Sequence, residues 1–168
     1  MGNYVIADIE WIDKGGFINP TQISAVKVNS NWSGLSHFSE KMKPRSKHFY
    51  MWNHVAYTGG TADSFLSARS AFHVFEDFDN WLDSDDVILW WFSTEKETYS
   101  ALIKSMFKRN PTQKQLVLRD YLDSFLNGNK FYKLKSYDTA RAFKIPVRGK
   151  EHDSFFDVLI IKDILNTM

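Results

Sequence analysis

Cysteine is absent from all 168 residues of the chain. Without it there is no disulfide framework, and no thiolate is available to bind a metal ion or to act as a nucleophile. Any metal ion must therefore be bound by oxygen or imidazole ligands.

Long hydrophobic runs are also missing. No segment reaches the roughly 18 consecutive apolar residues that a membrane helix needs. The first ten residues lack the basic start and the long apolar run of a signal peptide. We therefore expect a cytoplasmic protein with no membrane partner.

The chain has almost no excess of charge of either sign, with a formal net charge of +1. A nucleic-acid partner would have to be bound by local basic patches rather than by the field of the whole molecule. Hydrophobic residues make up 43% and charged residues 24%, as in ordinary globular proteins. Together with the length and the absence of repeats or linkers, this predicts one domain over residues 1–168.

The N-terminal third of the chain reads as strands. Residues 4–11 form a near-continuous apolar run, which is typical of a central strand covered on both faces. Glycine and proline within residues 15–20 mark a turn, and residues 22–28 and 35–42 read as two further strands. This order predicts an antiparallel meander.

After residue 61 the apolar residues recur at helical spacing. A helix is predicted from the N-cap Ser70 to Leu82, followed by a buried strand over residues 87–92. A capping-box pattern predicts that the next helix begins at Thr94, and Asn110 with Pro111 ends it. Residues 113–126 fit either a short strand plus a helix or one helix, and residues 134–143 and 154–166 read as helices. Strands followed by alternating helices and strand predict an α/β domain with a mixed sheet.

Two acidic residues, Asp8 and Glu10, end the first strand. Side chains two apart on a strand share a face, so these carboxylates project together. Oxygen ligands of this kind suit Mg²⁺ or Mn²⁺. The alternative is an ordinary polar strand end.

A third acid, Asp157, lies where an apolar helix face is expected. The residues three, four, seven and eight positions after it are Ile160, Ile161, Ile164 and Leu165. These spacings share one helix face, so Asp157 should point toward the core. Because a buried carboxylate is costly without a compensating partner, we expect a cation shared with Asp8 and Glu10.

His152 is the candidate base. It lies five residues before Asp157, about 140° away around an ideal helix, so it should precede the helix in a loop. An imidazole with an unperturbed pKa of about 6.5 suits a general base near neutral pH. Taken alone, His152 is better explained as an ordinary surface residue.

These residues resemble the DEDDh 3′–5′ exonucleases, the DnaQ-like branch of the ribonuclease H-like superfamily. Asp8 and Glu10 are similar to the family's first motif, and His152 and Asp157 to its third. Further similar segments, in the same order, are residues 20–28, 57–82 and 134–143. The resemblance implies a ribonuclease H-like mixed sheet, with an antiparallel meander plus parallel strands, flanked by helices.

The second motif departs from the family, which has an aspartate at the start of the helix after the buried strand. Residues 89–98 contain none. Glu95 is the candidate, because it shares a helix face with four apolar residues, Tyr99, Leu102, Ile103 and Met106. Glu97 is the rival, although a capping box with Thr94 also explains it. Thr98 fits the register too, and would leave the site one carboxylate short.

The resemblance implies a two-metal hydrolysis of phosphodiester bonds at 3′ ends, which releases nucleoside 5′-monophosphates. Two Mg²⁺ or Mn²⁺ ions would be bound by Asp8, Glu10 and Asp157, with Glu95 as the fourth acid and His152 as the base. The implied substrate is single-stranded or 3′-terminal DNA or RNA. Because the second motif lacks its aspartate, the alternative is a catalytically impaired domain that binds nucleic acid or protein, and a purely structural domain is the third possibility.

Substrate contacts are open on sequence alone. Four basic residues alternate at strand spacing, namely Lys41, Lys43, Arg45 and Lys47. They fit either phosphate contacts or the protection of an edge strand against aggregation. Trp11 and the aromatic stretch 49–52 fit either stacking on a terminal base or core packing.

Overall fold

A six-stranded mixed sheet forms the centre of the molecule in the computed structural model, which describes residues 2–14, 16–45, 55, 58, 60–125 and 135–168. The strands are β1 (Tyr4–Lys14), β2 (Phe17–Val28), β3 (Gly34–Lys43), β4 (Arg69–Ser70), β5 (Val87–Trp90) and β6 (Lys114–Val117). Their order is β4-β3-β2-β1-β5-β6. β1, β2 and β3 are antiparallel, whereas β5 is parallel to β1 and β6 is parallel to β5. The predicted fold class, a meander plus parallel strands, is confirmed.

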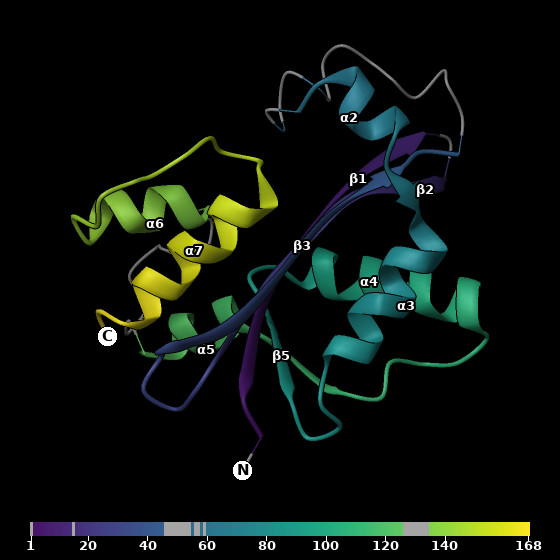
Figure 1. Ribbon diagram of the computed structural model, residues 1–168. Coiled ribbons are helices and arrows are strands. Elements are labelled where there is room, and N and C mark those ends of the chain that lie inside the picture. Colours follow the sequence, from purple (N-terminus) through teal and green to yellow (C-terminus); the bar gives the residue numbers. More distant parts are fainter. Residues whose placement is uncertain (1, 15, 46–54, 56–57, 59, 126–134) are drawn as a thin grey trace.

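Helices cover both faces of this sheet (Figure 1). They are α2 (Ala62–Leu66), α3 (Ala71–Trp81), α4 (Ser93–Phe107), α5 (Leu118–Phe125), α6 (Ser136–Ala142) and α7 (Ser154–Leu165). Apolar residues of α3 and α4 form one core with one face of the sheet, and those of α5, α6 and α7 form a second core with the other face. The ambiguous segment 113–126 is a strand followed by a helix, β6 and α5.

β1 lies between the two cores, and its side chains alternate between them. Val5, Ala7 and Ile9 pack in the α3–α4 core, while Ile6 packs in the α5–α7 core. Burial on both faces explains the continuous apolar run of this strand. Because Asp8 and Glu10 follow Ile6 at a spacing of two, they lie on the face that α6 and α7 cover.

The pairing of β1 with β2 contains a bulge at the acidic end of β1. Glu10 pairs with Gln22, but Trp11 pairs with Pro20, so Thr21 is the extra residue. Proline is tolerated at a bulge because the ladder is already interrupted there. The prediction that Pro20 belongs to the turn was therefore wrong, since β2 begins at Phe17.

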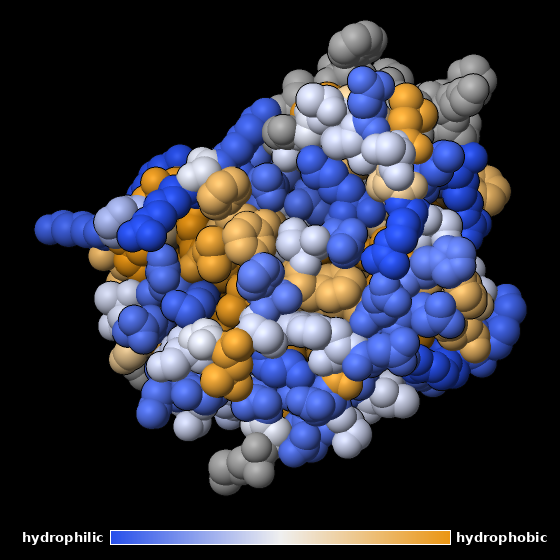
Figure 2. Space-filling model, viewed as in Figure 1, coloured by the Kyte–Doolittle hydropathy of each residue, from blue (hydrophilic) through white to orange (hydrophobic). Residues whose placement is uncertain are grey.

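The start of α3 follows its sequence signal: the Ser70 side chain accepts a hydrogen bond from the backbone N–H of His73. In the part of the chain that the structure describes, no helix is long and apolar enough to cross a membrane. Figure 2 shows a mostly hydrophilic face, on which apolar side chains gather over α7.

Candidate active site

Three carboxylates from two distant parts of the chain meet beside the sheet. Asp8 and Glu10 project from β1, and Asp157 projects from the first turn of α7. One carboxylate oxygen from each lies within 4.8 Å of the others. The Asp8 and Asp157 residues are only 7% and 8% exposed. The folded chain thus places the acid of the apolar helix face against the two acids of the first strand.

The electrostatics of this group are unfavourable without a cation. Burial raises the pKa of Asp8 well above its ordinary value, and the charges of Glu95, Glu10 and Asp157 raise it further. Burial, and then the charge of Glu10, raise the pKa of Asp157 to about 7. Oδ2 of Asp8 and Oδ1 of Asp157 are buried without a hydrogen-bond partner among the described residues. Buried carboxylates are normally paired or coordinated to metal, so this donor set fits a divalent cation.

Glu95 lines the same cleft, but it is outside the group of three. Its Oε2 accepts the backbone N–H groups of Trp91 at 3.0 Å and of Phe92 at 3.1 Å. Burial raises the pKa of Glu95 to about 8, while these two N–H groups act in the opposite direction. Glu95 is thus both a buried acid of the cleft and the acid that caps α4.

The predicted capping box of Thr94 and Glu97 was wrong. The buried β5 ends at Trp90, and α4 begins at Ser93 with Phe92 as its N-cap, so the third helical residue is Glu95. The Glu95 carboxylate accepts the backbone N–H of Phe92, whereas the Glu97 side chain is exposed. Thr98, the other alternative, is buried on the helix.

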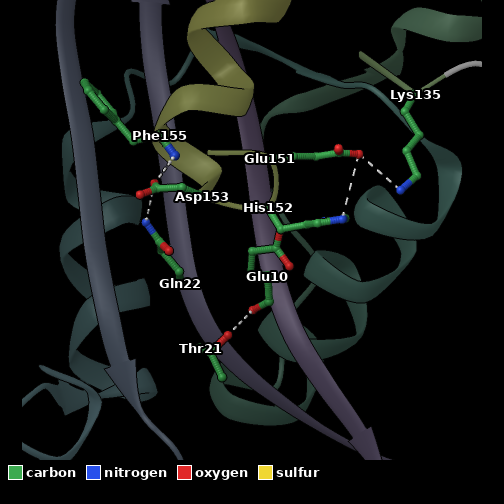
Figure 3. A network of polar contacts seen from close by, with 8 residues as sticks. All are labelled: Glu10, Thr21, Gln22, Lys135, Glu151, His152, Asp153 and Phe155. Carbon is green, nitrogen blue, oxygen red and sulfur yellow. Dashed lines mark hydrogen bonds and ion pairs between the residues drawn. The ribbon is translucent and has the colours of Figure 1, made fainter. Parts of the chain in front are cut away.

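His152 lies in the turn before α7, as its spacing from Asp157 predicts. Its backbone has a φ of 67°, a left-handed conformation that histidine adopts more readily than most residues. Nδ1 lies 3.8 Å from Oε1 of Glu10, and Nε2 lies 3.9 Å from Oε1 of Glu151 (Figure 3). The interaction with Glu10 raises the pKa of His152 above its ordinary value.

Side chains of β2 hold the N-terminus of α7 against the sheet (Figure 3). Oδ1 of the N-cap Asp153 accepts hydrogen bonds from the backbone N–H of Phe155 and from Nε2 of Gln22, both at 3.2 Å. Oγ of Ser154 lies 2.6 Å from Oγ of Ser24, and both serines are fully buried. These contacts fix the segment that carries His152 and Asp157.

Sequence reasoning missed these anchoring residues. Gln22 and Ser24 are polar positions in a strand whose neighbours Ile23 and Ala25 pack in the opposite core. Such a polar alternation is also typical of a strand face in water. Only the position of α7 shows that both side chains are buried and paired.

A cleft of about 230 Å³ opens onto the carboxylates. Besides the acids and His152, its lining includes Trp11, Phe92, Lys135 and Tyr137. Of the candidate substrate contacts, Trp11 therefore reaches the cleft. Lys47 and the aromatic stretch 49–52 lie outside the described residues.

The remaining basic residues of the alternating series lie away from this cleft. Lys43 and Arg45 are exposed, and none of the three described members, Lys41, Lys43 and Arg45, lines the cleft. Nζ of Lys41 lies 3.4 Å from Oγ of Ser64 and 5.3 Å from the centre of the Phe65 ring. Lys41 thus contacts α2.

Comparison with protein-family models and with curated protein sequences gave no match. Solved structures do match. The nuclease domain of 3′hExo, a DEDDh family member bound to rAMP, has a TM-score of 0.82 and 16% identity over 99% of this chain and 90% of that chain. A 3′-exonuclease that recognises the 3′ end of a histone mRNA stem-loop gives 0.83 and 15%, over 99% and 80%.

Exonuclease I of E. coli, in complex with a dT13 oligonucleotide, is a more distant match, with a TM-score of 0.78 and 13% identity. The match covers 99% of this chain but 41% of that enzyme. The chain therefore has the fold of the DEDDh exonucleases, a ribonuclease H-like fold. The resemblance predicted from the motifs is confirmed at the level of the fold.

Proposed function

We propose that this protein is a metal-dependent 3′–5′ exonuclease, with residues 1–168 as a single exonuclease domain. Its substrate would be single-stranded or 3′-terminal DNA or RNA, and its product nucleoside 5′-monophosphates. The observation that carries the proposal is the meeting of Asp8, Glu10 and Asp157 within 4.8 Å, with the buried Oδ2 of Asp8 left without a partner among the described residues. The fold shared with 3′-exonucleases supports the reaction class.

Two Mg²⁺ or Mn²⁺ ions are the proposed cofactors. Asp8, Glu10 and Asp157 would hold them, since these hard cations prefer carboxylate oxygens. Glu95, whose charge acts on Asp8, would be the fourth acid of the cleft. When bound, such ions supply charge neutralisation for the phosphodiester and activation of water.

His152 is the proposed general base. Nε2 lies 3.9 Å from Oε1 of Glu151, so the imidazole lies between two carboxylates. Nδ1 is the nitrogen on the Glu10 side, 3.8 Å from Oε1. A water that attacks the phosphorus would give its proton to the His152 imidazole, the bond from phosphorus to the 3′ oxygen would break, and solvent would protonate the departing oxygen.

The experiment follows the degradation of 5′-labelled and 3′-labelled single-stranded oligonucleotides with Mn²⁺. We expect the 3′ label to leave as a mononucleotide while the 5′-labelled strand shortens stepwise. Asp8→Asn and His152→Ala should abolish turnover. Asp163→Asn is the matched control, because this acid lies on α7 but outside the cleft. Activity that survives both site substitutions would refute the proposed roles.

A second candidate function is nucleic-acid or protein binding without catalysis. It is favoured by Glu95, which caps α4 and lies outside the group of three. Saturable oligonucleotide binding that a chelator leaves unchanged, with no turnover, would support this candidate over the exonuclease.

A further inference from the structure

Two residues of the cleft, on neighbouring helices, each carry a buried polar atom that has no hydrogen-bond partner among the described residues. One is the hydroxyl of Tyr137, in the first turn of α6, and the other is Oδ1 of Asp157, in the first turn of α7. Both residues line the cleft, and α6 packs against α7. Tyr137 is only 2% exposed, so water cannot readily take the place of a protein partner. A buried hydroxyl left unpaired destabilises the folded state.

The two atoms are chemically complementary. A phenol hydroxyl is a donor, and an ionised carboxylate is an acceptor only. A tyrosine hydroxyl keeps its proton near neutral pH, so it is available to donate. Both groups line the same cleft, on helices that pack against each other.

The other two acids near Tyr137 already have partners. Oε1 of Glu151 lies 3.2 Å from Nζ of Lys135. Oδ1 of Asp153 accepts hydrogen bonds from Gln22 and from the backbone of the helix that it caps. Oδ1 of Asp157 is thus the acceptor that the described residues leave open to the phenol.

We propose that Tyr137 is a positioning residue for Asp157. Its hydroxyl donates a hydrogen bond to Oδ1 of Asp157, and this bond fixes the orientation of the carboxylate and leaves Oδ2 for the cation. This inference rests on the proposed function, because it takes Asp157 as a metal ligand. Hydrogen bonds to ligating carboxylates keep them oriented, and loss of such an outer partner typically costs about 10- to 100-fold in metal affinity or activity.

The test is Mn²⁺ titration calorimetry of the full chain carrying Tyr137→Phe, which removes the hydroxyl alone. Tyr99→Phe is the matched control. Tyr99 is also buried, and its hydroxyl has no hydrogen-bond partner in the described part of the chain, but it lies in the core on the opposite face of the sheet. We expect Mn²⁺ affinity to fall about 10- to 100-fold in Tyr137→Phe and to be unchanged in Tyr99→Phe. Wild-type affinity in Tyr137→Phe would overturn the inference.

A second measurement separates this inference from the proposed function. Thermal midpoints in EDTA are compared for Tyr137→Phe, Asp157→Ala and the double variant. If the two groups share a hydrogen bond, the change in thermal midpoint of the double variant will differ from the sum of the changes in the two single variants. For the control pair, Tyr99→Phe and Asp157→Ala, the changes should add. A wild-type protein that binds no Mn²⁺ would overturn the proposed metal site. Additive shifts for Tyr137→Phe and Asp157→Ala would overturn the hydrogen bond.

Discussion

Asp157→Asn should stabilise the metal-free protein, although it removes a proposed metal ligand. The folded chain holds this carboxyl at a pKa of about 7, against an ordinary value of 3.8. A carboxyl with a raised folded pKa binds more protons in the folded than in the unfolded state, so its contribution to stability falls as pH rises between these two values. Above pH 7 the ionised carboxylate lowers the free energy of unfolding by its full amount. Asparagine has the same shape without the charge, so Asp157→Asn removes this destabilisation.

The size of the effect follows from the pKa shift. A shift of about 3 pKa units at about 1.4 kcal/mol each sets an upper bound of about 4 kcal/mol at pH 8. Because water entering the cleft and side-chain rearrangement relieve part of the repulsion, we expect a gain of about 2 kcal/mol in the free energy of unfolding. For a chain of this size that corresponds to a rise of roughly 4–8 °C in the thermal midpoint.

The assay is scanning calorimetry in EDTA at pH 8 and at pH 5. The gain should be less than half as large at pH 5, where the folded wild-type carboxyl is mostly protonated. Asp163→Asn on the same helix, whose side chain is 40% exposed, should stay within about 0.5 kcal/mol of wild type. An Asp157→Asn protein that is less stable than wild type in EDTA at pH 8 would show that the folded chain already compensates this charge, and would refute the reasoning.

Three further predictions concern the metal, the helix anchor and the fourth acid. Mn²⁺ should raise the thermal midpoint more at pH 8 than at pH 5, because protons compete with the metal ion for carboxyls whose pKa values are raised. An equal rise at both pH values, measured by calorimetry, would count against Asp8 and Asp157 as ligands. Ser24→Ala should cost about 1–3 kcal/mol in urea unfolding, because it leaves the buried Ser154 hydroxyl without this partner; an unchanged midpoint would contradict that. Glu95→Gln keeps an oxygen for the two backbone N–H groups but removes the charge, so the turnover rate should fall while α4 stays folded. The control Glu97→Gln, on an exposed side chain, should leave the turnover rate unchanged. Equal turnover rates for the two variants would show that Glu95 is not part of the site.

The main features of the fold could be predicted because they depend on periodicity. The run over residues 4–11 indicated a strand buried on both faces, and β1 lies between two cores. The apolar spacing after Asp157 indicated that this acid faces inward, and it lies against Asp8 and Glu10. Such patterns predict the folded structure well, because burial of the apolar face stabilises the helix or strand that carries it.

The remaining features depend on three-dimensional neighbours. The bulge at Thr21 and the reach of β2 back to Phe17 follow from strand pairing rather than from local sequence. The capping acid of α4 was assigned two residues too late, because Thr94 and Glu97 also match the capping-box pattern. The position of the Tyr137 hydroxyl in the cleft has no sequence signal, since an aromatic residue on a helix is ordinarily interpreted as core.

The most direct test of the central claim, that Asp8, Glu10 and Asp157 form a site for divalent cations, is an anomalous-difference map from crystals grown with Mn²⁺. We predict manganese peaks between these three carboxylates, with the Glu95 side chain in the same cleft. A map with no manganese at the three carboxylates, from crystals in which the cleft is open to solvent, would contradict the claim.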